Sequence, residues 1–460
     1  MILGMERTKI SQTPKKIGQK VKVCGWVQTR RDHGKLIFVD LRDISGIVQV
    51  VFGSEAKDLG NEFVLEVFGE VVNRPKNLVN DKIETGKIEL KAQEFKILGR
   101  SKSLPFPIDT DGHEIEEEVR LKYRYLDLRR TRLQKMIKVR SDLIRYAREF
   151  LFEKDFLEIE TPILTKSTPE GSRDFIVPSR LQKGEFYALP QSPQQYKQLL
   201  MIAGFERYFQ IARCLRDEDL RSDRTFEHTQ IDLEMSFVQR EDVMKLVEEL
   251  AVFVFESLGA RILAKPFPVF TYRDAVKKFG ADKFDLRNDK EKRENFLAFA
   301  WIVDFPFFEK TPEGKWTYTH NPFSAPVPAD EKKLIEGKIE GVLTSQYDLV
   351  CNGAEIGGGS IRSHDPKVLE KVFEVLGYKK EKIREKFGHM LEAFEYGAPP
   401  HGGIACGIER WLMTLTGERD IRETQAFPMT SRGRTSVMDA PSEVDETQLR
   451  ELGIQIKKSK

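Results

Sequence analysis

The sequence predicts an α+β protein, in which a small N-terminal β domain precedes a larger domain that mixes helices and strands. Residues 21–97 hold five short segments rich in Val, Ile and Phe, separated by Gly, Asp, Asn and Pro, a pattern typical of strands joined by turns. Further along, some stretches repeat apolar residues at intervals of three and four, as amphipathic helices do. With 460 residues, 40% of them hydrophobic, the chain can bury a large core and is expected to divide into two or three domains.

The five N-terminal segments have the length and number of strands in a small closed barrel. They cover residues 21–28, 36–43, 46–52, 63–72 and 87–98. A five-stranded barrel of this size is the OB architecture, which commonly binds single-stranded nucleic acid through basic and aromatic side chains. Arg30, Arg31, Arg42 and Phe38 are placed for such binding. The alternative is that Phe38 belongs to the core and the arginines only solvate an edge.

The proline-bearing stretch Ser103–Gly112 breaks the β pattern and is interpreted as a linker. We therefore expect the barrel domain at residues 1–104, a hinge at 105–125 and the second domain at 126–460. In the second domain, residues 132–156 and 241–259 have the periodicity of amphipathic helices.

Global charge and targeting signals restrict the possible partners and location. The net charge of +2 is the difference between 75 basic and 73 acidic residues, so a nucleic-acid partner requires local basic patches. The four cysteines form no CxxC pair, which argues against a zinc ribbon or a disulfide framework. The N-terminal residues lack the order of a signal peptide and no run approaches the ~18 apolar residues of a membrane span. A cytoplasmic protein without membrane contact is expected.

Two segments predict a nucleotide site. The stretch Arg213–Val238 is dense in opposite charges, which a folded chain seldom tolerates unless a ligand organises them. Strand-like runs at 206–215 and 229–238 flank its charged centre, and we expect this loop at the tip of an antiparallel hairpin. Near the other end of the chain, Gly402–Trp411 is an apolar run interrupted by glycines that ends in one Glu-Arg pair.

These segments carry a specific resemblance. "RDE" at residues 216–218, a helix-strand element ending at Pro162, and "GIER" ending at Arg410 are similar to the three signature motifs of class II aminoacyl-tRNA synthetases. Within that class, "GWVQTRRDHGKLIFVDLRD", "TPEGSRDFIVPSR" and "FYALPQSPQQYKQLL" resemble bacterial-type aspartyl-tRNA synthetases, and the likeness runs almost from end to end. The resemblance implies a catalytic domain built on an antiparallel sheet flanked by helices, behind an OB barrel that reads the anticodon.

The resemblance also implies an activity and its nucleotide site. ATP would activate L-aspartate to aspartyl-adenylate, and the aspartyl group would then pass to the 3′ end of tRNA(Asp). Arg216 would bridge the α-phosphate and the substrate carboxylate, and Arg410 would take the γ-phosphate end; these two are the catalytic candidates. Glu218 would fix the adenine amino group, and His228, Gln230 and Glu355 complete the implied ATP site. Asp348 and Glu355 would hold Mg²⁺, whose preferred ligands beside phosphates are hard oxygens.

Further positions follow from the same resemblance. Lys197 and Arg362 would read the side-chain carboxylate of aspartate, with His320 near the substrate. The α-amino group and pocket wall would be arranged by Glu170, Ser192, Gln194 and Asp232. Contacts with tRNA are implied in the barrel for Arg31, His33, Phe38, Gln49 and Glu89, and at the acceptor end for Arg221 and Arg224.

Three departures from the family pattern qualify these expectations. His228 stands where Phe usually stacks on adenine, and we expect a charged imidazole to make that contact pH-sensitive. The extra domain of bacterial members is missing, with a short linker near residues 288–300 in its place. His33 occupies a position where related enzymes that also charge tRNA(Asn) tend to carry His, which favours the same relaxed specificity here.

Two other functions remain open. One is a tRNA-independent, amide-forming paralogue resembling asparagine synthetase, which would have no use for an intact barrel. The other is a noncatalytic nucleic-acid-binding relative, which the presence of Arg216, Glu355 and Arg410 disfavours. The apolar face before Pro162 belongs to the element that forms the dimer interface in this class, so a homodimer is expected.

Overall fold

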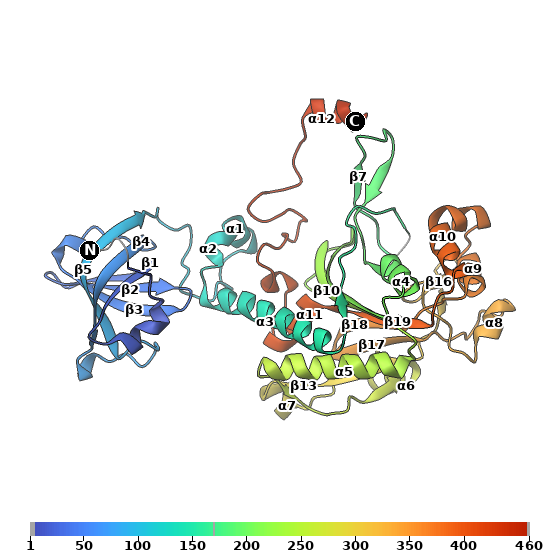
Figure 1. Cartoon of the computed structure of the whole chain (residues 1–460), viewed down its shortest axis with the longest axis horizontal. Coiled ribbons are helices and arrows are strands. Elements are labelled where there is room, and N and C mark those ends of the chain that lie inside the picture. Colours follow the sequence, from blue (N-terminus) through green and yellow to red (C-terminus); the bar gives the residue numbers. More distant parts are fainter. Residues whose placement is uncertain (1–4, 169–170, 458–460) are drawn as a thin grey trace. The chain divides into compact units, whose positions relative to one another are not determined.

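The computed structural model describes residues 5–168 and 171–457, and Figure 1 shows the whole chain. By internal contacts the chain divides into two compact units, Met1–Pro107 and Ile108–Lys460. Each unit has its own hydrophobic core.

The first unit is a closed barrel with strand order β1-β2-β3-β5-β4, which confirms the predicted OB fold. Its strands are β1 (Lys20–Asp32), β2 (Ile37–Asp43), β3 (Gly46–Phe52), β4 (Val64–Asn73) and β5 (Ile88–Gly99). Alternate residues of β2 point inward, so that Ile37, Val39 and Leu41 are fully buried. Phe38 lies between them on the outer face and is only partly buried. The alternative that Phe38 belongs to the core is therefore wrong.

The second unit is organised around an eight-stranded sheet in the order β12-β14-β17-β18-β19-β10-β9-β6. The central pairs are antiparallel, as expected, whereas the two edge pairs, β12 with β14 and β6 with β9, are parallel. The strands are β6 (Leu157–Glu158), β9 (Arg207–Leu215), β10 (Glu227–Ser236), β12 (Val269–Thr271), β14 (Phe299–Val303), β17 (Gln346–Cys351), β18 (Ala354–Ile361) and β19 (His401–Gly407).

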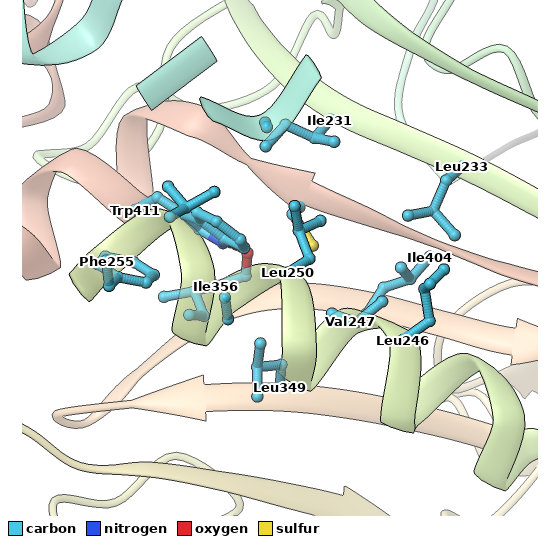
Figure 2. Packing of buried hydrophobic residues seen from close by; sticks show 14 of the residues in the cluster. Ile231, Leu233, Leu246, Val247, Leu250, Phe255, Leu349, Ile356, Ile404 and Trp411 are labelled. Atoms are coloured by element: carbon cyan, nitrogen blue, oxygen red, sulfur yellow. Dashed lines mark hydrogen bonds between the residues drawn. The ribbon is translucent and has the colours of Figure 1, made fainter. Parts of the chain in front are cut away.

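Three helices pack on one face of this sheet: α3 (Thr131–Glu153), α5 (Arg240–Ser257) and α11 (Ile408–Thr416). The first two confirm the helices predicted from periodicity. Figure 2 shows Leu246, Val247 and Leu250 of α5 directed toward apolar side chains of the strands. Trp411 closes one end of this core, with its ring 4.9 Å from that of Phe255 and its Nε1 donating to the carbonyl of Ile356.

The pleat of β10 sends its two sets of side chains to opposite faces of the sheet. Ile231 and Leu233 enter the core under the helices, and both are fully buried. Since neighbouring side chains on a strand alternate, Gln230, Asp232 and Glu234 project to the other face. The apolar helices on one side thus leave the opposite face of the sheet for a polar site.

The remaining elements surround this framework. Helix α1 (Glu117–Lys122) falls inside the segment for which we predicted a hinge, and its Arg120 pairs with Glu423 at 2.8 Å. The others are α2 (Arg124–Asp127), β7 (Ile176–Pro178), β8 (Phe186–Ala188), α4 (Gln194–Ile202), β11 (Arg261–Ile262), α6 (Tyr272–Phe279), α7 (Asp289–Arg293), β13 (Phe296–Leu297), β15 (Phe308–Lys310), β16 (Trp316–Tyr318), α8 (Glu331–Ile335), α9 (Pro366–Val375), α10 (Lys380–Glu395), α12 (Glu446–Leu452) and the short 3₁₀ helices η1 (Ile10–Lys16), η2 (Ser54–Ala56), η3 (Lys76–Leu78) and η4 (Ile421–Thr424).

None of the helices in the described ranges is both long and apolar enough to cross a membrane. All four cysteines are free thiols, in agreement with the prediction that they form no disulfide framework.

Candidate active site

A cavity of about 270 Å³ lies on the polar face of the sheet, and it gathers most of the residues predicted for the nucleotide and aspartate sites. Asp348 is buried and contacts the lining residues His320 and Gln346. Glu170 falls outside the described residues. The predicted residues that line the cavity are Ser192, Gln194, Lys197, Arg216, Glu218, Arg224, His228, Gln230, Asp232, His320, Glu355, Arg362 and Arg410.

The charge-dense loop is the tip of the β9–β10 hairpin, as predicted. The two strands pair antiparallel up to Leu215 and Glu227, and the amide of Arg216 donates to the carbonyl of Phe226 at 2.8 Å. The loop therefore starts and ends at the cavity, where Arg216 and Glu218 contribute to the lining. Arg224 also lines the cavity, whereas Arg221 does not, although the two form an isolated β-bridge.

Four charged side chains form a buried cluster at one end of the cavity, hereafter the charge cluster: Lys197, Asp232, Glu234 and Arg362. The Lys197 Nζ lies 2.8 Å from Asp232 Oδ1 and 3.2 Å from Glu234 Oε2. Arg362 donates two hydrogen bonds to Glu234, at 2.9 and 3.1 Å. All four side chains are at most 3% exposed. Such burial is tolerated because the two cations and two carboxylates balance each other.

The two carboxylates of the charge cluster differ in their electrostatics. Burial raises the pKa of Asp232, and Lys197 only partly opposes this effect. Burial acts in the same direction on Glu234, but Arg362 and Lys197 outweigh it and hold the pKa of that carboxyl below its usual range. The second oxygen of Asp232, Oδ2, is buried and accepts no hydrogen bond among the described residues. Because a buried orphan acceptor is costly, this oxygen is suited to receive a donor from a ligand.

A second group of charges surrounds Glu355, which also lines the cavity. Lys283 Nζ lies 2.8 Å from Glu355 Oε2 and Arg410 Nη1 lies 3.9 Å from Oε1. Burial alone would raise the pKa of Glu355, but Lys283 and Arg410 hold it below its usual range. Burial and the neighbouring Glu355 carboxylate raise the pKa of Asp348. Burial opposes the charged form of His320, yet Asp348, 3.1 Å away, raises the pKa of that imidazole.

The residues around Glu355 offer a metal only two carboxylates. In the described parts of the chain, no group of three or more His, Cys, Asp or Glu side chains is arranged to hold a metal ion. Mg²⁺ usually binds one or two carboxylates together with substrate phosphates and water, and the pair Asp348 and Glu355 fits that mode.

The glycine run at residues 357–359 serves two purposes. An added Cβ on Gly359 would lie 2.3 Å from the carbonyl oxygen of Gly403, so this position is required by close packing against β19. Gly358 lines the cavity, and its Cβ would lie 3.2 Å from Asp348 Oδ1. Close packing against β19 thus accounts for Gly359, whereas Gly358 brings backbone to the cavity.

His228 is neutral, which corrects the expectation of a pH-sensitive contact. Burial, together with Arg216 and Arg410, lowers the pKa of His228 to about 3. Cys214 donates to Gln230 Oε1, so the amide nitrogen of Gln230 faces the His228 Nε2 at 3.2 Å. Since that amide nitrogen can only donate, Nε2 of His228 accepts and its proton resides on Nδ1. An imidazole in this state does not titrate near neutral pH.

In the barrel unit, the predicted tRNA-binding residues form a connected row on the outer surface. Arg31 donates to both oxygens of Asp40 at 2.9 Å and to Gln49 at 3.2 Å. Gln49 in turn donates to Glu89 at 2.8 Å. His33 meets Phe38 edge to face, with ring centroids 5.3 Å apart. Strands β1, β2, β3 and β5 thus present polar and aromatic groups side by side.

Comparison with known proteins agrees with this architecture. The family described as tRNA synthetases class II (D, K and N) matches residues 116–431, and the family described as OB-fold nucleic acid binding domain matches residues 21–98. The chain belongs to the class II tRNA synthetases. It is an aminoacyl-tRNA synthetase with an OB-fold anticodon-binding domain.

Individual relatives and structures are similar over almost the whole synthetase. It is 42% identical to the aspartate–tRNA(Asp/Asn) ligase of Methylacidiphilum infernorum, over 96% of this chain and 95% of that protein. It is 39% identical to the aspartate–tRNA ligase of Bacillus licheniformis, over 97% and 98%. The structure of asparaginyl-tRNA synthetase from Pyrococcus horikoshii, at 25% identity, matches with a TM-score of 0.74, covering 94% of this chain and 99% of that chain.

The synthetase is shorter than these bacterial relatives. Its alignment with the Methylacidiphilum protein runs over 572 positions, more than its own 460 residues, so the relative contains residues that are missing here. That these residues form the extra domain predicted to be missing stays a prediction, as does its location at the 288–300 linker.

Three charged residues of the site escaped the sequence reasoning. Glu234 and Lys283 are described above. The third, Glu409, is buried, accepts from the amide of Thr229 at 3.0 Å and pairs with Arg140 at 2.8 Å. It thereby ties helices α3 and α11 to β10 beside His228. The sequence held a signal for two of them: Glu234 follows Asp232 by two positions on a strand and must share its face, and Glu409 belongs to the Glu-Arg pair of the GIER motif.

Proposed function

We propose that this synthetase is an aspartate–tRNA ligase, which activates L-aspartate with ATP and transfers it to tRNA(Asp). The observation that carries the proposal is the charge cluster, in which Lys197 and Arg362 line the cavity while each is paired with a buried carboxylate. A second carboxylate distinguishes aspartate from most amino acids, and these two cations would bind it. The α-ammonium would satisfy the orphan Oδ2 of Asp232. Ser192, Gln194 and His320 line the same cavity, and Glu170 completes the proposed pocket.

Activation requires the aspartate α-carboxylate to attack the α-phosphate of ATP while pyrophosphate leaves. The reaction brings two anions together, so the protein contributes mainly positioning and neutralisation of charge. Arg216 lines the centre of the cavity, and its planar guanidinium suits a bridge between carboxylate and phosphate. Arg410 lies beside Glu355 toward the γ-phosphate end. Glu218, His228 and Gln230 are assigned to the adenine.

We assign Asp348 and Glu355 to Mg²⁺, on the strength of the two-carboxylate geometry described above. When bound by these two carboxylates, Mg²⁺ would neutralise part of the phosphate charge. Arg216 and Arg410 neutralise the rest, and the apolar core beneath β18 keeps both carboxylates in place.

Transfer to tRNA needs contacts at two distant places on that molecule. Arg221 and Arg224 in the hairpin loop would bind phosphates of the acceptor end. The row formed by Arg31, Gln49 and Glu89 offers hydrogen bonds to base edges, and the half-exposed Phe38 offers a surface for stacking. His33, which meets Phe38 edge to face, stands at the position from which the sequence resemblance implies charging of tRNA(Asn) as well as tRNA(Asp).

A homodimer is proposed from the exposed side of helix α3. Ile137, Ile144 and Phe152 line an open groove of about 560 Å³ there, and the Phe152 side chain is 52% exposed. The same groove is also lined by Arg140, Ser141, Arg145, Arg148 and Glu149. Apolar side chains exposed among charged ones on a long helix are suited to a second copy of the chain. Light scattering after gel filtration is expected to give twice the chain mass, and a monomer mass at micromolar concentration would contradict the proposal. The cytoplasm is the proposed location.

The decisive experiment is ATP–pyrophosphate exchange driven by single amino acids. We expect exchange with aspartate and only background with asparagine, glutamate or lysine. Aspartate-independent exchange, or exchange with asparagine alone, would overturn the assignment of the substrate. Aspartylation of purified tRNA(Asn) tests the relaxed specificity, and charging no higher than background would refute it.

A further inference from the structure

Lys283 occupies a position that the nucleotide site described so far does not explain. It follows helix α6 and is not itself among the residues that line the cavity. Its ammonium lies 2.8 Å from Glu355 Oε2. Arg410 approaches the other oxygen of the same carboxylate and also donates to the main-chain carbonyl of Glu355 at 3.0 Å. The Glu355 carboxylate therefore lies between two cations from different parts of the chain.

The segment that carries Lys283 is firmly anchored. The next residue, Phe284, is buried and stacks on Phe279 with ring centroids 3.9 Å apart. Arg287 binds both oxygens of Asp285 at 3.0 and 2.8 Å and also donates to the carbonyl of Phe296. A lysine on a solvated loop would sample many positions, whereas these contacts hold the backbone of Lys283 beside Glu355.

We propose that Lys283 is a further phosphate-binding residue, which together with Arg410 binds the β- and γ-phosphates of ATP and the pyrophosphate product. This inference rests on the proposed function. A triphosphate whose distal end lies at Arg410 brings its charge within reach of the Lys283 ammonium, because both cations contact one carboxylate. Lysine is a compact cation with three donors, which suits phosphate oxygens of varying position.

Charge in the region supports a role beyond that of a counter-ion. Arg410 is shared between Glu355 and Asp223, whose Oδ2 lies 3.8 Å from its Nη2. Arg410 alone would therefore face two carboxylates before any phosphate arrives. With Lys283 bound to Glu355, the local charge is balanced, and an incoming phosphate chain meets two cations. The Lys283 side chain is 43% exposed, so its ammonium can also reach a phosphate that binds beside Glu355.

The test compares the full-length wild type with Lys283→Met, Lys283→Arg and the control Lys292→Met. Lys292 lies in the same region, is 47% exposed and pairs with Asp285 rather than with Glu355. Calorimetric titration with ATP in the absence of aspartate, and with inorganic pyrophosphate, measures binding without turnover. Titrations are run with Mg²⁺ and with a chelator. Circular dichroism checks that each variant is folded.

Loss of a charge-assisted contact is expected to weaken binding of ATP and pyrophosphate by about 10- to 100-fold in Lys283→Met. Lys283→Arg should retain most of the affinity, while Lys292→Met and aspartate binding should be unchanged. If Lys283 only balances Glu355, Lys283→Met will bind pyrophosphate as well as the wild type or more tightly, which overturns the inference alone. If the wild type itself binds neither ATP nor pyrophosphate, the proposed function fails as well.

Discussion

The replacement Lys197→Met tests the charge cluster most directly. The side chain of Lys197 is 2% exposed and touches both Asp232 and Glu234. Methionine has a similar length but no charge, so two buried carboxylates would share the single cation Arg362. Removing one partner of a buried ion pair costs about 3–5 kcal/mol, because the remaining charge is left without compensation. We expect the free energy of unfolding to fall by this amount near pH 8.

The same variant should become more stable, relative to the wild type, as the pH is lowered. Burial already raises the pKa of Asp232 and Lys197 opposes that effect, so the pKa rises further in the variant. The folded state then binds more protons than the unfolded chain, whose Asp has a pKa of about 3.9. Because the folded state of the variant binds more protons, its free energy of unfolding decreases as the pH rises above about 4. Guanidinium unfolding at pH 5.5 and 8, followed by near-ultraviolet circular dichroism of the buried Trp301 and Trp411, measures the difference.

A matched control is Lys154→Met. Lys154 pairs with Glu249 at 2.7 Å, but both side chains are 40% exposed. An exposed pair of this kind contributes about 1 kcal/mol or less, with little dependence on pH. Equal losses for Lys197→Met and Lys154→Met, or a loss in Lys197→Met that does not grow with pH, would refute the reasoning.

Other predictions concern binding and catalysis. His228→Phe should lower the KM for ATP because a phenyl ring offers a larger apolar surface to adenine, and since the pKa of His228 is about 3 the effect should be equal at pH 6 and 8; an unchanged or raised KM would count against it. Arg216→Ala should reduce aspartate-dependent exchange by about 100-fold or more, and normal exchange would remove Arg216 from the mechanism. Phe38→Ala should weaken tRNA binding by about 1–3 kcal/mol without affecting exchange, as measured by filter binding; unaltered binding would exclude stacking.

The parts of the fold that were predictable depend on local patterns. The strands of the barrel and the β9–β10 hairpin follow from alternation and turn residues that lie within a few positions of each other. The order of the large sheet does not, because β19 inserts between β10 and β18 although some 165 residues separate it from β10 in sequence. The packing of α5 and α11 on the apolar face determines which strands lie beside β19.

The same distinction applies to the site. Arg216, Glu218 and Arg410 belong to contiguous motifs, and the structure brings them to one cavity. Lys283 acts through Glu355, far away in sequence, and does not stand out from its neighbours. Glu409 stands in the GIER motif, but its pairing with the distant Arg140 cannot be read from that motif. An isolated charge predicts only a solvated side chain until tertiary contacts remove it from water.

The charge cluster also bears on how the synthetase could reject asparagine. The net charge of the cluster cannot distinguish aspartate from asparagine, because Asp232 and Glu234 already balance Lys197 and Arg362. The unused hydrogen-bond donors can distinguish the two amino acids. A guanidinium has five N–H groups, and Arg362 uses three of them, two on Glu234 and one on Ser360. Lys197 similarly spends two of its three donors on the carboxylates.

What remains for the substrate from these two residues is a set of donors without an acceptor. A carboxylate can accept from all of them. The amide of asparagine would instead place its NH₂ group next to a buried N–H donor, so that neither donor would have an acceptor. Each unsatisfied group costs about 1–3 kcal/mol. Glu234 therefore matters because it holds Arg362 in a fixed orientation, with its unused N–H groups directed away from Glu234.

Because the barrel that reads tRNA is a separate unit, strict choice of the amino acid is compatible with a relaxed choice between two tRNAs.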